Sequence, residues 1–171
     1  RMLMNFGASI NHAIKDGCTA LHLASSGGHQ QLVSDLLSHG ADVHAEMRDG
    51  GSPLHLAAGN GHTQVLCKLV AAGADIDMAS HNRCTALIYA ANYGHENATK
   101  VLIELGARLD HLTAKKSSAL MLAAQHGHEA ACSLLVAADA ACLETKNTLG
   151  RAPTASGDAV LWARVEGAQA A

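Results

Sequence analysis

The sequence has 171 residues, 49% hydrophobic and 16% charged, a balance that excludes an intrinsically disordered chain and predicts one folded domain. The net charge is −3, with 12 Lys and Arg against 15 Asp and Glu. We expect no nucleic-acid partner, because no positive field is available for a phosphate backbone. No apolar run approaches the roughly 20 residues that span a bilayer, so we expect a soluble protein of the cytoplasm or nucleus without a membrane partner.

The predicted elements follow a repeat of 33 residues. Its first anchor is a hydroxyl residue followed by Ala or Pro and then Leu, at Thr19, Ser52, Thr85 and Ser118. The second anchor is a Gly-His pair, beginning at Gly28, Gly61, Gly94 and Gly127. The third is a Gly-Ala-Asp triplet or a variant of it, beginning at Gly40, Gly73, Gly106 and Asp139. Three anchors in one register indicate a repeat architecture.

Each unit opens with a predicted short helix. The hydroxyl residue is a candidate N-cap, and Pro53 suits the first helical position because its missing N–H costs nothing there. In the first unit we expect Leu21, Leu23 and Ala24 to form the apolar side of this helix. The helix is expected to end at Gly28, since Gly readily adopts a positive φ.

A second predicted helix follows the Gly turn. In the first unit it carries Leu32, Val33, Leu36 and Leu37 at helical spacing, which predicts one buried stripe. Helices shorter than about 12 residues are marginal in isolation. We therefore expect each unit to be stabilised by stacking on its neighbours in a solenoid.

The 33-residue unit, with its Thr-Pro-Leu-His-like opening, Gly-His turn and Gly-Ala-Asp ending, resembles the ankyrin repeat. The resemblance covers nearly all of residues 1–150. It implies an all-α ankyrin-repeat solenoid of stacked helix-turn-helix units with short β-hairpin fingers between them.

We expect a single ankyrin repeat domain over residues 1–171 that begins in the middle of a repeat, because segment 7–11 resembles the end of an earlier unit. Val160, Leu161 and Trp162 are expected to cover the last repeat. The expected parts are the end of a truncated repeat at 1–11, full repeats at 12–44, 45–77, 78–110 and 111–143, and a degenerate C-terminal cap at 144–171.

The units depart from the family pattern at two positions. The opening histidine is present as His22 and His55 but is replaced by Ile88 and Met121, so we expect its hydrogen bonds to be missing from the last two units. Asp139 stands where the other units have the turn Gly. We expect it to be a strained left-handed residue.

The five cysteines are odd in number and form no Cys-x-x-Cys pair, which argues against a disulfide framework and a zinc ribbon. A reducing compartment fits this pattern. Cys18 and Cys84 stand at equivalent positions two units apart, too far for a disulfide in a regular stack. We expect both to be exposed thiols.

No sequence motif of a metalloprotease, serine hydrolase, P-loop or dinucleotide site occurs, so we expect no catalytic residue and no cofactor. The most ligand-like cluster among the twelve histidines is His126, His128 and Cys132. The two histidines flank a Gly turn, and no second cysteine lies nearby in the sequence. We therefore expect no metal ligand.

The resemblance implies that partners sit on a concave face made by the fingers and the exposed side of each first helix. Carried over onto this sequence, the candidate protein-binding residues are Ile14, Lys15, Asp16, Met47, Arg48, Asp49, His81, Asn82, Asn92, Tyr93, Leu112, Lys115, Gln125 and His126.

Four of these residues form a candidate anchor, since apolar and aromatic side chains supply much of the binding energy of interfaces: Ile14, Met47, Tyr93 and Leu112. Ile14 and Met47 stand where ankyrin units commonly place a turn-stabilising Asp. Alternatively, these two residues pack on each other and merely stiffen the fingers. Finger charges of both signs suit a partner of mixed polarity.

We expect a non-enzymatic protein–protein interaction module, a scaffold or adaptor that is monomeric in isolation and binds a protein or peptide. One alternative is a regulatory ankyrin domain of a larger enzyme or ubiquitin-ligase-type assembly, docking on a catalytic domain outside this chain. Others are a small-ligand or metal site at the finger histidines and a purely structural spacer. The fold alone does not choose between them.

Overall fold

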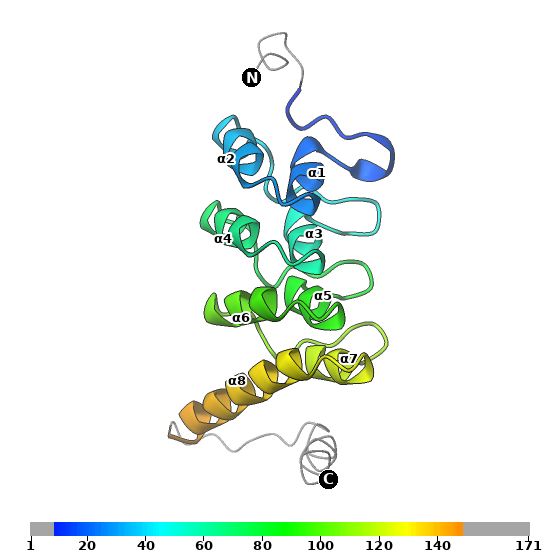
Figure 1. The fold of residues 1–171 in the computed structure, drawn as a ribbon. Helices are drawn as coiled ribbons and strands as arrows, with labels where there is room; N and C mark the ends of the chain where they lie inside the picture. Colours follow the sequence, from blue (N-terminus) through cyan, green and yellow to red (C-terminus); the bar gives the residue numbers. More distant parts are fainter. Residues whose placement is uncertain (1–8, 149–171) are drawn as a thin grey trace. The chain divides into compact units, whose positions relative to one another are not determined.

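The computed structural model describes residues 9–148, which form a short 3₁₀ turn and eight α-helices (Figure 1). In chain order these are η2 (Lys15–Gly17), α1 (Ala20–Ser26), α2 (Gln30–Ser38), α3 (Pro53–Gly59), α4 (Thr63–Ala71), α5 (Ala86–Asn92), α6 (Glu96–Glu104), α7 (Ala119–Gln125) and α8 (Glu129–Thr148). No strand is present in this part of the chain, so the all-α class is confirmed there.

The chain divides into two compact units, and the boundary between them lies between Leu135 and Val136, inside α8. In the first unit, helices α1, α3 and α5 pack on their partners α2, α4 and α6. Figure 1 shows an inner row of α1, α3, α5 and α7 beside an outer row of α2, α4 and α6. Each helix packs on the next in its row, which confirms the predicted stacking. In the second unit, residues 136–148 continue α8 as helix.

The inner helices begin at the predicted hydroxyl residues. Thr19 and Ser52 each take part in a capping box with the histidine three residues later. The side chains of Thr85 and Ser118 accept the N–H of the residue three positions on, at 3.4 and 3.2 Å. These bonds satisfy N–H groups that have no partner within a first helical turn.

The turn after each inner helix requires Gly, as Gly61 illustrates. Its φ is +74°, a left-handed conformation that costs other residues about 1–2 kcal/mol. A Cβ on Gly61 would also lie 2.8 Å from Nδ1 of His95 in the next repeat. Conformation and close approach together explain why a Gly-His pair stands at this turn.

The core of the first unit is built from leucines and small residues. Leu21, Leu54 and Leu87 are buried at the same position of successive inner helices. The alanine pairs Ala57–Ala58 and Ala90–Ala91 are fully buried between inner helices, where they allow close approach. A core of this kind needs few aromatic residues, in agreement with their 2% share of the sequence.

Two predicted core positions are wrong. Leu23 is 58% exposed and Leu32 is 48% exposed, although both belong to the apolar positions expected to be buried in the first unit. Val33 and Leu36 of α2 are buried as expected. Helices α1 and α2 each bury a stripe that is narrower than their apolar face, so Leu23 and Leu32 at the edges of these stripes remain exposed to solvent.

The turn expected at Asp139 is also absent. Helix α8 runs without interruption from Glu129 to Thr148, so Asp139 is helical, and it is not among the residues with positive φ. The earlier units place Gly at this position to end the helix. Here Ala and other helix-forming residues surround Asp139, and nothing local stops propagation.

The expected boundary between residues 143 and 144 falls inside α8. Most of the expected cap, with Val160, Leu161 and Trp162, lies outside the described residues, as do residues 1–8. The division of the chain into repeats and cap stays a prediction. A search of the described helices finds none long and apolar enough to cross a membrane.

Candidate functional site

Four loops precede the inner helices and are named here finger 1 (residues 13–18), finger 2 (46–51), finger 3 (79–84) and finger 4 (112–117). A backbone hydrogen bond of 2.8–3.0 Å closes each finger, from the second residue to the sixth: Ile14 to Cys18, Met47 to Gly51, Ser80 to Cys84 and Thr113 to Ser117. One such bond is too little for a strand, so the predicted β-hairpins are tight loops without strands in the described chain.

Neighbouring fingers are tied to one another through their backbones. One N–H of each later finger donates to a carbonyl of the finger before it, at 2.8–2.9 Å: Arg48 to Asp16, His81 to Asp49, and Ala114 to Asn82. Figure 1 shows the four fingers following one another along the same side of the inner helices. The fingers therefore form a continuous row with a fixed spacing.

The two opening histidines link each inner helix to the finger of the following repeat. His22 Nε2 donates to the Gly51 carbonyl at 3.2 Å, and His55 Nε2 donates to the Cys84 carbonyl at 2.9 Å. Because a carbonyl can only accept, Nε2 carries the proton and Nδ1 is the acceptor. In α3, Nδ1 of His55 accepts the Ser52 N–H at 3.0 Å.

Both rings are held in their neutral form. Burial lowers the pKa of His22 and His55 below the ordinary value of 6.5, since the charged ring would lose its hydration. Ile88 and Met121 cannot make these bonds, and the described residues show none in their place. The expected loss is confirmed for Ile88, since the carbonyl of Ser117 receives only the finger-closing bond among the described residues. The equivalent carbonyl for Met121, that of Gly150, lies outside the described residues.

A second series of histidines points backwards along the stack. The Gly-His histidines donate from Nε2 to a carbonyl at the end of the preceding inner helix, at 2.8–3.1 Å: His62 to Ser26, His95 to Gly59 and His128 to Asn92. Each of these bonds satisfies a carbonyl that has no partner within its own helix. Successive inner helices are therefore linked at their C-terminal ends.

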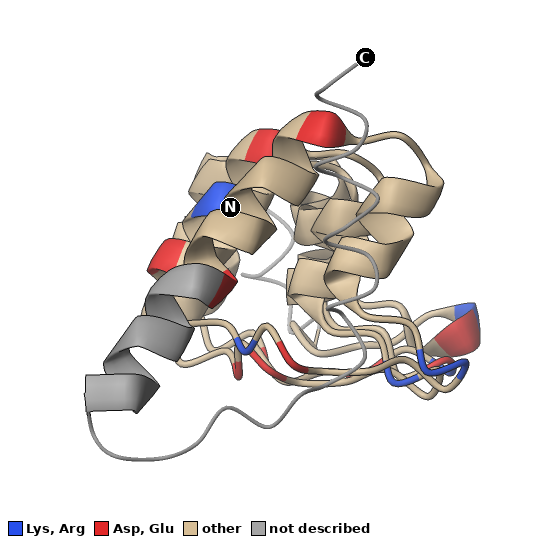
Figure 2. Cartoon of the chain, turned by 90° about the horizontal axis from the view of Figure 1, so that it is seen from below, with Lys and Arg blue, Asp and Glu red and all other residues tan. Residues whose placement is uncertain are grey.

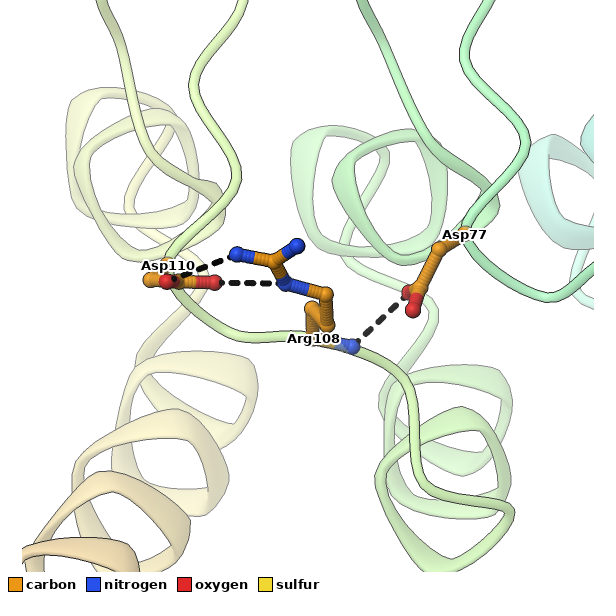
Figure 3. Close-up of polar contacts among 3 residues, drawn as sticks. All are labelled: Asp77, Arg108 and Asp110. Carbon is orange, nitrogen blue, oxygen red and sulfur yellow. Dashed lines mark hydrogen bonds and ion pairs between the residues drawn. The ribbon is translucent and has the colours of Figure 1, made fainter.

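The loops after the outer helices carry a third connection, drawn in Figure 3. Asp77 Oδ1 accepts the backbone N–H of Arg108 at 2.9 Å, and Asn11 makes the equivalent bond to Asp42 at 2.8 Å. The Arg108 guanidinium forms two bonds of 3.1 Å to Asp110, which raise the pKa of Arg108. The backbone bond joins two repeats, whereas the ion pair lies within one loop.

The fingers and the inner helices together form a surface that we call the finger face. A row of apolar side chains runs along it at one helical position: Leu23, Leu56, Tyr89 and Leu122. Helices α1, α3, α5 and α7 contain no Lys, Arg, Asp or Glu, and Figure 2 draws them without charged colours. Charged residues of the finger face therefore belong to its fingers.

One groove of about 500 Å³ lies on the finger face between fingers 3 and 4 and helices α5 and α7. It is lined by Asn82, Cys84, Ile88, Tyr89, Asn92, Tyr93, Thr113, Ala114, Lys115, Ser117 and Leu122. Tyr93 is 57% exposed, and its ring centroid lies 6.4 Å from that of Tyr89. The groove has an apolar floor, two aromatic rings and several amide and hydroxyl groups, which is the composition of a binding site.

Four predicted contact residues come together in this groove: Asn82, Asn92, Tyr93 and Lys115. Outside it lie Ile14, Lys15, Asp16, Met47, Arg48, Asp49, His81, Leu112, Gln125 and His126. The sequence does not predict the roles of Ile88, Tyr89 and Leu122 in the lining. They occupy apolar helical positions that periodicity alone assigns to the core.

The four anchor candidates do not form one patch. Tyr93 lines the groove, whereas Ile14, Met47 and Leu112 do not. Met47 is half-buried, and its side chain lies over its own finger. Its Cε atom would be 3.0 Å from a Cβ placed on Gly51, the last residue of that finger. Ile14 and Leu112 are exposed.

The fingers differ in whether the side chain at position 14 or its equivalent can accept a hydrogen bond. In fingers 3 and 4, hydroxyl groups replace the family's Asp: Ser80 accepts the Cys84 N–H at 3.3 Å and Thr113 accepts that of Ser117 at 3.1 Å. In finger 2, Met47 cannot accept, and the Asp49 side chain takes the Gly51 N–H at 2.9 Å.

Charge is distributed unevenly among the fingers. Arg48 of finger 2 pairs with Asp16 of finger 1 at 3.1 Å, and these two fingers together carry two cations and three carboxylates. Fingers 3 and 4 carry Arg83, Lys115 and Lys116 and no acidic residue. Charges of both signs thus occur over the four fingers taken together, and the carboxylates among them belong to fingers 1 and 2.

The candidate metal cluster does not assemble. No three side chains of His, Cys, Asp or Glu lie close enough to hold a metal within the described part of the chain. The rings of His126 and His128 are 6.1 Å apart, and His128 is engaged with Asn92. Cys132 is buried, and burial raises the pKa of its thiol.

Cys18 and Cys84 are free, as predicted, but half-buried instead of exposed. Cys84 packs into its finger, where its N–H is bonded to Ser80. Burial raises the pKa of the Cys84 thiol and keeps it protonated at neutral pH. The side chain is a lining element of the groove and a poor nucleophile.

Comparison with known proteins agrees with this architecture. A family model described as ankyrin repeats (3 copies) matches residues 1–80 and 54–147. The Notch-regulated ankyrin repeat-containing proteins of Homo sapiens, Mus musculus and Xenopus tropicalis are 47% identical to this chain over 38 residues, or 22% of this chain. The chain spans about a third (33%) of the length of these curated relatives. The chain belongs to the ankyrin repeat family, whose repeats are general protein–protein interaction modules and typically non-catalytic.

Proposed function

We propose that this chain is a non-enzymatic module that binds a protein or peptide partner on its finger face, as a scaffold or adaptor of the cytoplasm or nucleus. The observation that carries the proposal is the groove between fingers 3 and 4 and helices α5 and α7. It combines an exposed aromatic ring with polar groups on a surface fixed by bonds between repeats.

Tyr93 is the main candidate anchor of the interface. More than half of its side chain is exposed, and Tyr is one of the residue types in which binding energy concentrates. Asn82 and Asn92 lie in the same groove, where their amides supply donors and acceptors for a partner's backbone. A partner that covers Tyr93 therefore gains apolar contact without leaving its own polar groups unpaired.

Rigidity supports binding at this surface. The histidine and finger bonds hold α3, α5 and α7 and the fingers in place before a partner arrives. A preformed surface lowers the conformational entropy lost on association. The proposed mechanism is therefore display on a fixed scaffold by a module that is monomeric in isolation.

The chemistry of the titratable groups supports a non-enzymatic role. His22 and His55 are buried, and both of their ring nitrogens are occupied by structural hydrogen bonds. The Cys84 thiol beside the groove has a raised pKa and is protonated at neutral pH. None of these groups is poised as a general base or a nucleophile.

Affinity capture with the 171-residue chain tests the proposal. The bait is compared with Tyr93→Ala and with Leu32→Ala, a matched change of an exposed apolar residue on outer helix α2. We expect partners that are retained by the original chain and by Leu32→Ala and lost by Tyr93→Ala. A partner retained equally by all three baits would place the interface elsewhere.

A further inference from the structure

The two fingers and two helices that line the groove carry charges of a single sign. Residues 79–84 and 112–117 contain Arg83, Lys115 and Lys116 and no carboxylate, and α5 and α7 carry no charge. Arg83 and Lys115 and Lys116 all have exposed side chains. In Figure 2 the inner helices are tan, and the blue Lys and Arg segments and red Asp and Glu segments of the superimposed fingers lie on the loops at the right.

Among the residues whose side chains the structure describes, these three cations have no ion-pair partner. The ion pairs among residues 9–139 are Arg48–Asp16 and Arg108–Asp110, and neither includes a cation of finger 3 or 4. Fingers 1 and 2 differ, since Lys15 and Arg48 stand beside Asp16 and Asp49 in the sequence. Fingers 3 and 4 are therefore the fingers that carry cations without a carboxylate of their own, whereas Asp49 of finger 2 acts electrostatically on Tyr89 in the groove.

Two of the cations occupy backbone positions where Gly would be relaxed. Arg83 has φ +57° and Lys116 has φ +59°, whereas the equivalent Gly17 and Gly50 have φ +80° and +76°. A left-handed conformation costs a non-Gly residue stability. In fingers 3 and 4, cationic residues thus stand at backbone positions where Gly would give a more stable fold.

We propose that the groove binds an extended peptide segment in which acidic side chains flank an apolar or aromatic one; this inference rests on the proposed function. The apolar side chain packs against Tyr89, Tyr93 and Leu122. The carboxylates of the segment interact with Arg83, Lys115 and Lys116. The amides of Asn82 and Asn92 form hydrogen bonds with the backbone of the segment.

Charge complementarity identifies the occupant. The chain as a whole has a net charge of −3, so an acidic segment gains no general attraction and is drawn only to this local cationic patch. The same net charge disfavours nucleic acid, whose phosphates extend well beyond the groove. Exposed charges are screened by salt, so binding should weaken as ionic strength rises.

Selection from a random library of displayed 12-residue peptides tests the inference on the 171-residue chain. The enriched peptides are then measured by fluorescence anisotropy against Lys115→Glu and Lys100→Glu. The second variant reverses an exposed charge on α6 and matches the first in net charge. Thermal unfolding of both variants checks that they remain folded.

We expect the enriched peptides to carry a net negative charge and an apolar or aromatic residue. Lys115→Glu should weaken their binding about tenfold, because an attraction is replaced by a repulsion, while Lys100→Glu leaves binding unchanged. Enrichment of neutral or basic peptides that depend on Tyr93 would overturn this inference and leave the proposed function standing.

Three further results would also overturn the inference. Enriched peptides that are insensitive to both Tyr93→Ala and Lys115→Glu would remove the groove as the binding site, and the proposed function with it. Failure to enrich any peptide would show that a short segment is not the ligand. A single-stranded oligothymidylate that binds more tightly than the selected peptides would make nucleic acid the partner.

Discussion

His55 donates from Nε2 to the carbonyl oxygen of Cys84 across 2.9 Å, and so joins helix α3 to finger 3 of the next repeat. The same oxygen accepts the N–H of Ser80 that closes the finger. One buried ring thereby determines how an inner helix sits against the finger that borders the groove.

Replacing this ring should weaken the stack. His55→Ile installs the residue that the chain itself has at the equivalent position, Ile88, and leaves the Ser52 N–H without its ring acceptor. Losing partners at a buried site costs about 1–3 kcal/mol, so we expect the free energy of unfolding in urea to fall by about 2–3 kcal/mol. Ile88→Val, which changes only volume, should cost about 1 kcal/mol. Equal stability of His55→Ile and the original chain would mean that the bond is not structural.

The same histidines should make stability depend on pH. Their pKa is lowered in the folded chain, so below pH 6.5 the unfolded chain binds protons that the folded chain does not. Stability from His22 and His55 is therefore complete above pH 6.5 and is lost as the pH falls toward their folded pKa, by up to about 1.4 kcal/mol per pH unit for each ring. Urea titrations between pH 7.5 and 5 should show a smaller pH slope for His55→Ile. An unchanged slope would contradict the assignment.

Relaxing the backbone of finger 3 should have the opposite effect on stability. Arg83→Gly removes a left-handed non-Gly residue, and we expect the chain to gain about 1 kcal/mol in denaturant titrations. Gly50→Ala is the reciprocal control and should destabilise, since its Cβ would also lie 2.8 Å from the His81 backbone nitrogen. Arg83→Gly should at the same time weaken binding of acidic peptides. A loss of stability in Arg83→Gly would show that the arginine makes a favourable contact in its finger.

The contacts drawn in Figure 3 allow the contribution of a hydrogen bond between repeats to be compared with that of a surface ion pair. Asp77→Ala removes the acceptor of the Arg108 N–H, and we expect the free energy of unfolding to fall by about 1 kcal/mol. Arg108→Ala retains that backbone bond and loses only an exposed pair with Asp110, so it should change stability little. If the two variants are equally destabilised, the ion pair is the stabilising element.

Local features of the fold can be predicted from the sequence because they depend on nearby residues. The N-caps at Thr19 and Ser52 and the turn at Gly61 are determined by groups within a few positions, and all are confirmed. The repeat register predicts a turn at Asp139, but helix propensity prevails there. The repeat register therefore predicts the end of a helix only in units that have Gly at the turn position.

The groove depends on contacts between repeats that periodicity cannot reveal. Tyr89 and Leu122 follow the same helical pattern as core leucines, and only stacking leaves them partly exposed on the finger face. Tyr93 can be predicted because it stands at a family contact position. The positive charge beside it is harder to predict, because Arg83 occupies a position where fingers 1 and 2 have a turn glycine.

Hydrogen–deuterium exchange of the chain with and without a captured partner tests the central claim most directly. We predict that partner binding protects amides in fingers 3 and 4 and in helices α5 and α7, and leaves α4 and α6 unchanged. Protection confined to the outer helices α4 and α6 would contradict binding on the finger face.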